Sequence, residues 1–231
     1  MQEKGTLSVN TENLMPIIKK WLYSDKDIFL RELVSNACDA ISKLDKLASM
    51  GEAAMPESCR VEIRANKSEN TLTVSDNGLG MTADEVRKYI NQVAFSGAYD
   101  FLEKYENQAD GKDIIGHFGL GFYSAFMVAE KVVIQTKSYQ PGEEAVRWES
   151  DGSSEYELSS GSRTQPGTDV ILYIDEDSRE FLEEPRLRSV LTKYCSFLPR
   201  PVFLCGEKEE QINDCSPLWL KKPADCTEQE Y

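Results

Sequence analysis

The segment "FLRELVSNACDA", residues 29–40, determines how the rest of the chain is interpreted. Its apolar residues recur at the spacing of a helix that packs one side against a core. Glu32, Asn36 and Asp39 follow one another at intervals of four and three residues, so their side chains lie on one neighbouring stripe of that helix. A polar stripe of this kind, taken alone, most often faces water. Motifs elsewhere in the sequence indicate whether this stripe faces a ligand instead.

Length and charge limit the classes of function. The chain has 231 residues, enough for one large domain or two small ones. Its net charge of −14 repels polyanions, so we expect neither a nucleic-acid partner nor a membrane surface as partner. The sequence shows no leader-like segment and no run approaching about 20 apolar residues. We therefore expect a cytoplasmic protein. Because the net charge is negative, a bound polyphosphate would need backbone N–H groups or a cation to offset the repulsion.

The cysteines do not form a metal-binding or disulfide pattern. Six cysteines lie far apart, and His117 is the only histidine. A structural zinc site needs closely spaced Cys or His ligands, and disulfide frameworks are typical of much smaller chains. We expect reduced thiols that mainly pack.

The order of expected elements indicates an α+β fold. Alternating apolar residues predict strands, helical spacing predicts helices, and Thr82 with Glu85 forms a capping box. Ser24 and Asp25 can cap the helix that contains residues 29–40. The expected order is a strand at 6–9, two helices, a hairpin over 59–78, a helix over 81–95, a surface loop at 97–115, a helix over 122–130, strands within 131–138, 144–160 and 168–175, and a helix over 185–197. This order predicts a two-layer sandwich whose antiparallel or mixed sheet is covered on one face by helices.

The segment "TVSDNGLGMT", residues 73–82, places an acid and two glycines directly after a strand. Gly78, Gly80 and Ala83 formally match the dinucleotide fingerprint, but the helix begins too late and the strand belongs to a hairpin. Asp76 can instead accept a hydrogen bond from an exocyclic amine such as N6 of adenine, and it would repel O6 of guanine. Glycines would let the backbone approach a flat base. An ordinary surface turn is an equally good interpretation of this motif alone.

The segment "IGHFGLGFYSAF", residues 115–126, carries Gly116, Gly119 and Gly121 just before an expected helix. Free N–H groups at a helix start and the positive end of the helix dipole favour phosphate binding. No Lys followed by Ser or Thr completes a P-loop, so a metal ion would have to neutralise the phosphates. The alternative is a flexible hinge before a core helix.

These two segments give the polar stripe a candidate task. The carboxamide of Asn36 can supply an oxygen ligand to Mg²⁺. Glu32 lies one turn earlier, where a carboxylate can orient and deprotonate a water that attacks a γ-phosphate. Asp39 can hold the helix face or a water network. Together, the three segments favour a nucleotide site over a stripe that faces water.

The order E-x-x-x-N, D-x-G-x-G and G-x-x-G-x-G resembles the Bergerat ATP-binding fold of gyrase-type topoisomerases, heat-shock chaperones, histidine kinases and MutL. Within that superfamily, "DIFLRELVSNACDAISKL", "SDNGLGMT", "IGHFGLGFYSAFMVAEKV" and "GTDVILYI" resemble the N-terminal domain of the ninety-kilodalton heat-shock chaperones of the bacterial HtpG type. The similarity runs from about residue 5 to 205. It implies an ATP-binding domain over residues 1–205, followed by a linker and the start of a middle domain over 206–231.

The resemblance also implies roles for individual residues. Glu32 would be the general base and Asn36 the Mg²⁺ ligand. Asp76 would bind the adenine amine, while Thr168 would support the base through a water. The full set implied to contact ATP or ADP is Leu33, Asn36, Asp39, Asp76, Gly80, Met81, Gly116, Gly119, Gly121, Phe122 and Thr168.

At the level of the whole protein, the resemblance implies an ATP-driven chaperone. Residues 95–121 would form a lid over the nucleotide, and residues 6–9 a strand exchanged between protomers of a homodimer. The partners would be client proteins and the chain's own middle and C-terminal domains. Hydrolysis by this part alone would be slow, because an arginine from the middle domain completes the γ-phosphate site. Phe95 and Ala98 replace the lysine and threonine of the family's "AKSGT", and Tyr89 replaces a polar residue.

Three other functions remain alternatives. A gyrase- or MutL-type ATPase subunit shares the motifs, but the negative charge disfavours it. A signalling kinase would need an upstream phosphoacceptor histidine, which we do not expect. A non-hydrolysing module would use ATP only as a conformational ligand.

Overall fold

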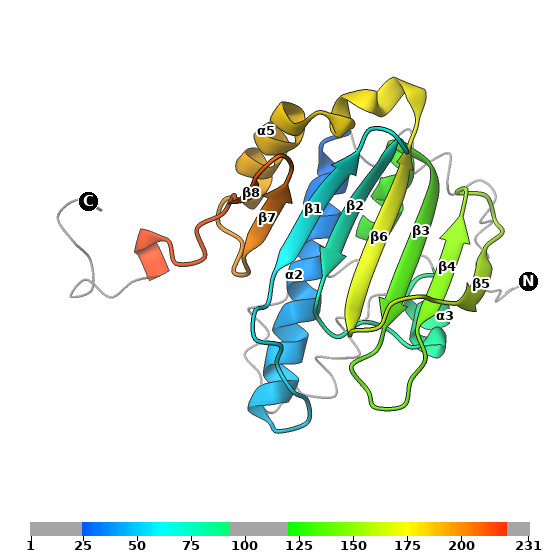
Figure 1. Ribbon diagram of the computed structural model, residues 1–231, viewed down its shortest axis with the longest axis vertical. Helices are drawn as coiled ribbons and strands as arrows, with labels where there is room; N and C mark the ends of the chain where they lie inside the picture. The colour runs from blue at the N-terminus through cyan, green and yellow to red at the C-terminus, as the bar shows by residue number, and fades with distance from the viewer. Residues whose placement is uncertain (1–24, 93–119, 221–231) are drawn as a thin grey trace, which may run out of the picture.

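The computed structural model describes residues 25–92 and 120–220 (Figure 1). The expected strand at 6–9, the first helix, Ser24 and most of the expected lid, with Gly116 and Gly119, lie outside the described residues. The described residues hold one sheet, several helices and the loops between them.

The predicted helix around residues 29–40 is α2, which extends from Ile28 to Ser49. Before it begins, the carboxylate of Asp25 accepts a hydrogen bond from the N–H of Asp27 at 3.0 Å. Met50 caps the C-terminal end of the helix, and Gly51 follows with a φ of +79°, a conformation that glycine adopts without strain. Among the described residues, no helix combines the length and apolar character needed to cross a membrane.

The sheet is mixed and has eight strands in the order β5-β4-β3-β6-β2-β1-β7-β8. Its neighbours pair antiparallel except β1 and β7, which are parallel. The strands are β1 (Val61–Asn66), β2 (Thr71–Asp76), β3 (Ala129–Lys137), β4 (Val146–Ser150), β5 (Glu157–Ser160), β6 (Gly167–Ile174), β7 (Val202–Cys205) and β8 (Glu209–Gln211). The predicted hairpin is therefore the pair β1 and β2.

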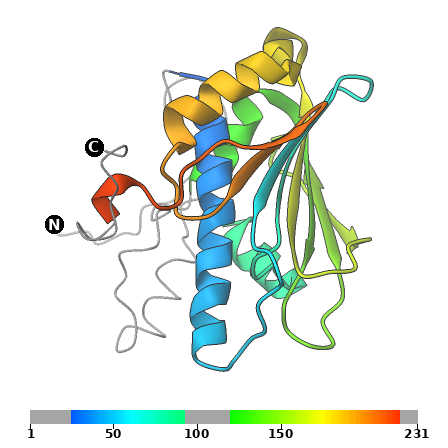
Figure 2. The same cartoon turned by 60° about the vertical axis from the view of Figure 1, so that its left-hand side comes forward.

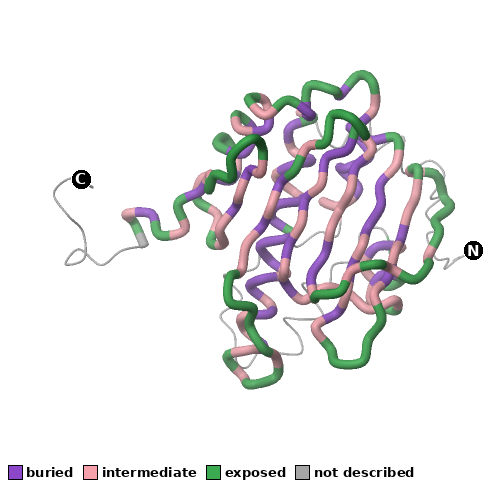
Figure 3. Tube along the Cα trace, in the orientation of Figure 1, coloured by how far each residue is buried: buried purple, intermediate pink, exposed green. Residues whose placement is uncertain are grey.

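Helices cover one face of this sheet, as the sequence predicts. Figure 2 shows α2 and α5 (Glu184–Cys195) on the same side of the strands. Ile63, Val74 and Ile134 are buried in the same core cluster as residues of α2, while the residues next to Ile63 and Val74 along β1 and β2 are more exposed. Figure 3 shows buried and less buried residues following one another along the strands. These features confirm the predicted α+β fold with two layers.

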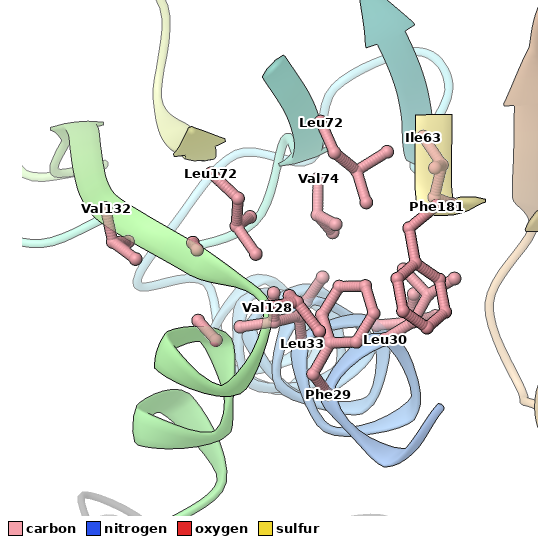
Figure 4. Close-up of a cluster of buried hydrophobic side chains, with 14 of the residues drawn as sticks. Phe29, Leu30, Leu33, Ile63, Leu72, Val74, Val128, Val132, Leu172 and Phe181 are labelled. Carbon is pink, nitrogen blue, oxygen red and sulfur yellow. The ribbon is translucent and has the colours of Figure 1, made fainter. Parts of the chain in front are cut away.

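The core lies where α2 meets the centre of the sheet. Phe29, Leu30 and Leu33 point from α2 toward Leu72 and Leu172 of the strands (Figure 4). Phe29 also meets Phe181 edge to face, with ring centroids 5.0 Å apart. Phe181 belongs to η5 (Glu176–Leu182), a 3-10 helix between β6 and α5. Burial of each such side chain contributes roughly 1.5–3 kcal/mol, so this stripe of α2 fixes the helix on the sheet.

Two predicted helices are shorter in the structure. The helix expected over 122–130 is a 3-10 helix, η4 (Gly121–Met127), and the chain enters β3 at Ala129. Its turns are closed by bonds between residues three apart, such as Tyr123 N–H to Leu120 C=O at 3.1 Å. The helix expected over 81–95 is α3 (Ala83–Tyr89) with the predicted capping box at its start. Apolar spacing located both helices but could not determine where tertiary packing ends them.

Five cysteines lie in the described residues, and all five are free, as predicted. Cys38 and Cys195 are fully buried. Burial raises the pKa of the Cys195 thiol to about 12, so this group stays protonated and packs as a small apolar side chain.

Sequence analysis missed the strands β7 and β8, which extend the sheet beyond residue 205. Asn213 explains why the chain returns to the sheet here. Its Oδ1 accepts from the N–H of Val202 at 2.8 Å, and its Nδ2 donates to the carbonyls of Leu198 and Arg200, each at 2.8 Å. The residue is 6% exposed, so these backbone groups have little access to water. The sheet thus depends on a residue beyond the boundary expected at 205.

We expect Asn213→Ala to lower the free energy of unfolding by about 1–3 kcal/mol or more, because it removes the partner of buried backbone groups. Urea unfolding measured by circular dichroism tests this. Glu210→Ala is the control, since Glu210 forms only an exposed ion pair with Arg188 and its loss should cost at most about 1 kcal/mol. Equal stability of the two variants would contradict a structural role for Asn213.

Candidate functional site

Asp76 ends β2 with its carboxyl group buried; the residue is 6% exposed. Its Oδ1 accepts the N–H of Gly78 at 2.8 Å, and Thr168 on β6 lies directly opposite in the strand register. Burial raises the pKa of the Asp76 carboxyl to about 7, although the N–H of Gly78 and the charge of Arg163 act in the opposite direction. A carboxyl group with so high a pKa marks a candidate site.

The two glycines after Asp76 serve the loop itself. A Cβ at Gly78 would come within 2.6 Å of the backbone of Ala40 on α2. Gly80 has a φ of +60°, and a Cβ there would collide with the backbone carbonyl of Lys137 on β3. The loop therefore runs between α2 and β3 with room for no side chain at either position. Close approach of protein backbone is by itself enough to require glycine at both positions.

Two threonines, Thr136 and Thr168, connect this loop to the sheet, and sequence analysis identified only Thr168. The N–H of Met81 donates to Thr136 Oγ1 at 2.9 Å, and that hydroxyl lies 2.9 Å from Thr168 Oγ1. Thr136 Oγ1 also donates to the carbonyl of Gly167, at 3.2 Å. Thr136 is fully buried and was not predicted; the available signal was a threonine continuing the inward-facing series of Val132 and Ile134.

The polar stripe of α2 lies beside this loop. The N–H of Leu79 donates to the carbonyl of Ala40 at 3.3 Å, which ties the loop to α2. Along the stripe, Glu32 is half-buried, Asn36 is exposed, and Asp39 is 5% exposed. Burial is the main cause of the raised pKa of the Cys38 thiol. The charges of Cys195, Asp39 and Asp76 raise it further, so Asp39 and Asp76 both lie near this residue of α2. The structure therefore brings the predicted stripe and Asp76 together.

Glu32 also meets the start of η4. A Cβ at Gly121 would lie 2.5 Å from Glu32 Oε2, so the Glu32 carboxylate lies directly against the backbone of Gly121. Arg31 donates to the other oxygen of Glu32, with Nε–Oε1 at 3.1 Å. The structure thus places Glu32 beside Gly121, the one glycine of this segment that lies in the described residues.

Other predicted residues are placed less directly. Leu33 is 3% exposed and packs in the core, so its side chain serves the fold. The ring of Phe122 is half-buried and meets Tyr123 and Trp148 with centroids 5.5 and 5.6 Å apart. Tyr89 is half-buried, and Lys88 Nζ lies 5.3 Å from the centre of its ring.

The arrangement has two chemically distinct ends. A buried carboxyl group with two threonine hydroxyls suits a flat polar group that offers a hydrogen-bond donor. The exposed carboxamide of Asn36 and the carboxylate of Glu32 offer oxygen ligands and a base, which suit a hydrated metal ion or a water nucleophile. An elongated ligand with a nucleobase at one end and phosphates at the other would fit both ends of this arrangement.

Comparison with known proteins also supports a nucleotide site. Residues 24–166 match the family described as histidine kinase-, DNA gyrase B-, and HSP90-like ATPase. The chain is 53% identical to the chaperone protein HtpG of Bacteroides fragilis, with 99% of this chain and 35% of that protein covered. It is 48% identical to the HtpG of Porphyromonas gingivalis, with 100% of this chain and 35% of that protein covered. It is 39% identical to the mitochondrial heat shock protein 75 kDa of Bos taurus, with 99% and 32% covered. The chain spans about a third of the length of these relatives.

We expect Asp76 to make stability depend on pH. Its pKa is about 7 when folded and near the ordinary 3.8 when unfolded, so ionisation favours the unfolded chain as pH rises between these values. In Asp76→Asn this contribution is absent. Between pH 4 and pH 8, the unfolding free energy of wild type should therefore fall relative to that of Asp76→Asn, by up to about 4 kcal/mol.

Chemical denaturation across this pH range tests the prediction. Asp214→Asn, at an exposed position, is the control and should retain the pH dependence of the wild type. A constant difference between Asp76→Asn and wild type would mean that Asp76 is ionised when folded throughout the range.

Proposed function

Because this chain belongs to the histidine kinase-, DNA gyrase B- and HSP90-like ATPase family, we propose that it binds ATP and slowly hydrolyses it as the nucleotide domain of an HtpG-type chaperone. The observation that carries the proposal is the buried Asp76 carboxyl group facing Thr168 beside the polar stripe of α2. Burial of an ionised carboxylate costs free energy unless a ligand or another protein group forms hydrogen bonds with it.

In this proposal Asp76 recognises the adenine. The ionised carboxylate accepts a hydrogen bond from N6, where guanine would present a repelling oxygen. Thr168 supports the base through a water, and Gly80 and Met81 line the pocket with their backbone. The backbone position of Met81 is fixed by its bond to Thr136, so the pocket wall is held before any ligand arrives.

The phosphates and Mg²⁺ would lie along the exposed side of α2. Asn36 fits a magnesium ion because it presents a neutral oxygen ligand at an exposed position one turn from Glu32. Bound Mg²⁺ would neutralise phosphate charge. Glu32 would take a proton from the attacking water, while Asp39 holds the helix face and Gly116, Gly119, Gly121 and Phe122 lie at the phosphates. Residues 95–121 would form the lid.

The proposal extends to the whole protein. The relatives are about three times longer, which supports further middle and C-terminal domains, a homodimer and client proteins as partners. The sheet reaches Gln211, so the ATP-binding unit extends past 205 before the chain leads into a next domain. Five free cysteines support a reducing compartment, such as the cytoplasm.

We expect Asp76→Asn to bind ADP roughly 10–100-fold more weakly than wild type, since one hydrogen bond to a buried charge is lost. Isothermal titration calorimetry with ADP and Mg²⁺ measures this, and wild type should bind GDP far more weakly than ADP. Thermal unfolding of the same variant in the titration buffer checks that it is folded, so that weaker binding cannot be attributed to unfolding. Equal affinity of wild type for ADP and GDP would contradict base recognition by Asp76.

We expect Glu32→Ala and Asn36→Ala to separate turnover from binding. Glu32→Ala should lose at least about 100-fold of the ATP hydrolysis rate and keep its affinity for ADP within a few-fold, because a general base acts on the water. Asn36→Ala should instead lose Mg²⁺-dependent affinity. Measurements of phosphate release and calorimetry test both variants. Unchanged hydrolysis by Glu32→Ala would favour the alternative in which ATP is only a conformational ligand.

A further inference from the structure

Arg163 lies in the loop between β5 and β6, and its side chain is largely withdrawn from water, with 14% exposed. Its Nη2 donates to the backbone carbonyl of Asp76 at 2.6 Å and to that of Pro166 at 3.4 Å. Its Nε donates to the carbonyl of Gln165 at 3.1 Å. Its Nη1 forms an ion pair with the carboxylate of Asp169. One guanidinium group thus joins the end of β2 to the loop that enters β6.

The backbone makes room for this guanidinium group. Gly167, the first residue of β6, has a φ of +125°, which strongly favours glycine. A Cβ at Gly167 would come within 2.5 Å of Arg163 Nη2 and would also collide with the carbonyl of Asp76. The positions of Gly167 and Arg163 therefore depend on each other.

The other end of the guanidinium is also fixed. Asp169, its ion-pair partner on β6, accepts a hydrogen bond from the hydroxyl of Ser75 on β2. Ser75 and Asp169 face each other in the register, one pair before Asp76 and Thr168. Arg163 therefore holds both strands at the step where the buried carboxyl group and the threonine hydroxyl face each other.

We propose that Arg163 is a positioning residue for recognition of the nucleotide base: by binding the backbone of Asp76 and of the turn before Thr168, it sets the Asp76 carboxylate and the Thr168 hydroxyl at the spacing that the base requires. This inference rests on the proposed function, because it assigns Arg163 to the same pocket. The side chain acts through Asp76 and Thr168, and its described contacts are with protein groups.

Only arginine has the donor geometry for this role. Its planar group offers several N–H donors in fixed directions, so it binds three carbonyls and a carboxylate at once. Lysine would keep the charge but could not hold all four acceptors. The charge of Arg163 also favours the ionised form of Asp76, against burial and against the charge of Asp169. The other polar groups at Asp76 are the N–H groups of Gly78 and Thr168, and Asp39 lies nearby on α2.

The test compares Arg163→Gln and Arg163→Lys with Arg147→Gln in this same chain. Arg147 is the matched control, because it lies on β4 of the same sheet and forms an ion pair with Glu149 away from the Asp76 loop. Calorimetry with ADP and Mg²⁺ gives affinities, and thermal unfolding confirms folding. We expect roughly tenfold weaker ADP binding for Arg163→Gln, an intermediate loss for Arg163→Lys, and a change under about twofold for Arg147→Gln.

A double-mutant cycle with Asp76→Asn distinguishes positioning from general loss of structure. If Arg163 acts through Asp76, adding Arg163→Gln to Asp76→Asn should cost clearly less than its tenfold effect in wild type. Equal costs in both backgrounds would overturn the proposal, as would normal ADP affinity in Arg163→Gln. If Arg163→Gln does not fold, the same cycle is run with Arg163→Lys. Absence of ADP binding in wild type would instead overturn the proposed function.

Discussion

Burial of the Asp76 carboxyl group is the constraint to which much of the described structure responds. A charged carboxylate at this place would lose most of its hydration, and burial accordingly raises its pKa to about 7. The surrounding groups reduce that cost without removing it. The N–H of Gly78 donates to the carboxylate, and Arg163 brings a positive charge near it through the backbone carbonyl. A residue kept close to its titration point at neutral pH can respond to a ligand that offers one more donor.

The loop that follows Asp76 shows how packing fixes this group. Gly78 lies against the backbone of α2 and Gly80 against the backbone of β3, so the loop is confined between helix and sheet. The bonds from Leu79 to Ala40 and from Met81 to Thr136 confine it in the same directions. The two glycines thus reflect close approach of protein backbone, which would hold the proposed nucleobase pocket in place before a ligand binds. Preorganisation of this kind lowers the entropic cost of binding.

The sequence predicted the features that depend on local pattern. Helical spacing located α2, alternation located the β1–β2 hairpin, and the Thr82–Glu85 capping box was correct because each of these is set by residues within a few positions. Within the candidate site, Asp76, Glu32 and Gly121 were singled out from motifs of a few residues each, and their roles toward a ligand remain predictions. Thr136, Arg163 and Asn213 were not singled out, because their roles depend on partners that are distant in the sequence. These partners lie 11 to 15 residues away for Asn213, 31 to 55 for Thr136, and 87 for Arg163 with Asp76. The 3-10 geometry of η4 was also missed, since its seven residues bridge the α2 surface and β3.

Helix α2 carries core residues on one side and the polar residues of the candidate site on a neighbouring stripe. Phe29, Leu30 and Leu33 fill the core, and the neighbouring stripe carries Glu32, Asn36 and Asp39. The three polar residues differ in exposure along the stripe: Asn36 is open to water, Glu32 is half-buried against Gly121, and Asp39 is buried near the Asp76 loop. In the proposed function, the buried Asp39 would lie toward the nucleobase and the exposed Asn36 toward the metal and phosphates, because a nucleobase is best held in a dry pocket and a metal-bound phosphate near water. In the proposed function the polarity of this stripe serves the two ends of one nucleotide, and the core packing of the same helix would hold the residues that bind those ends in place.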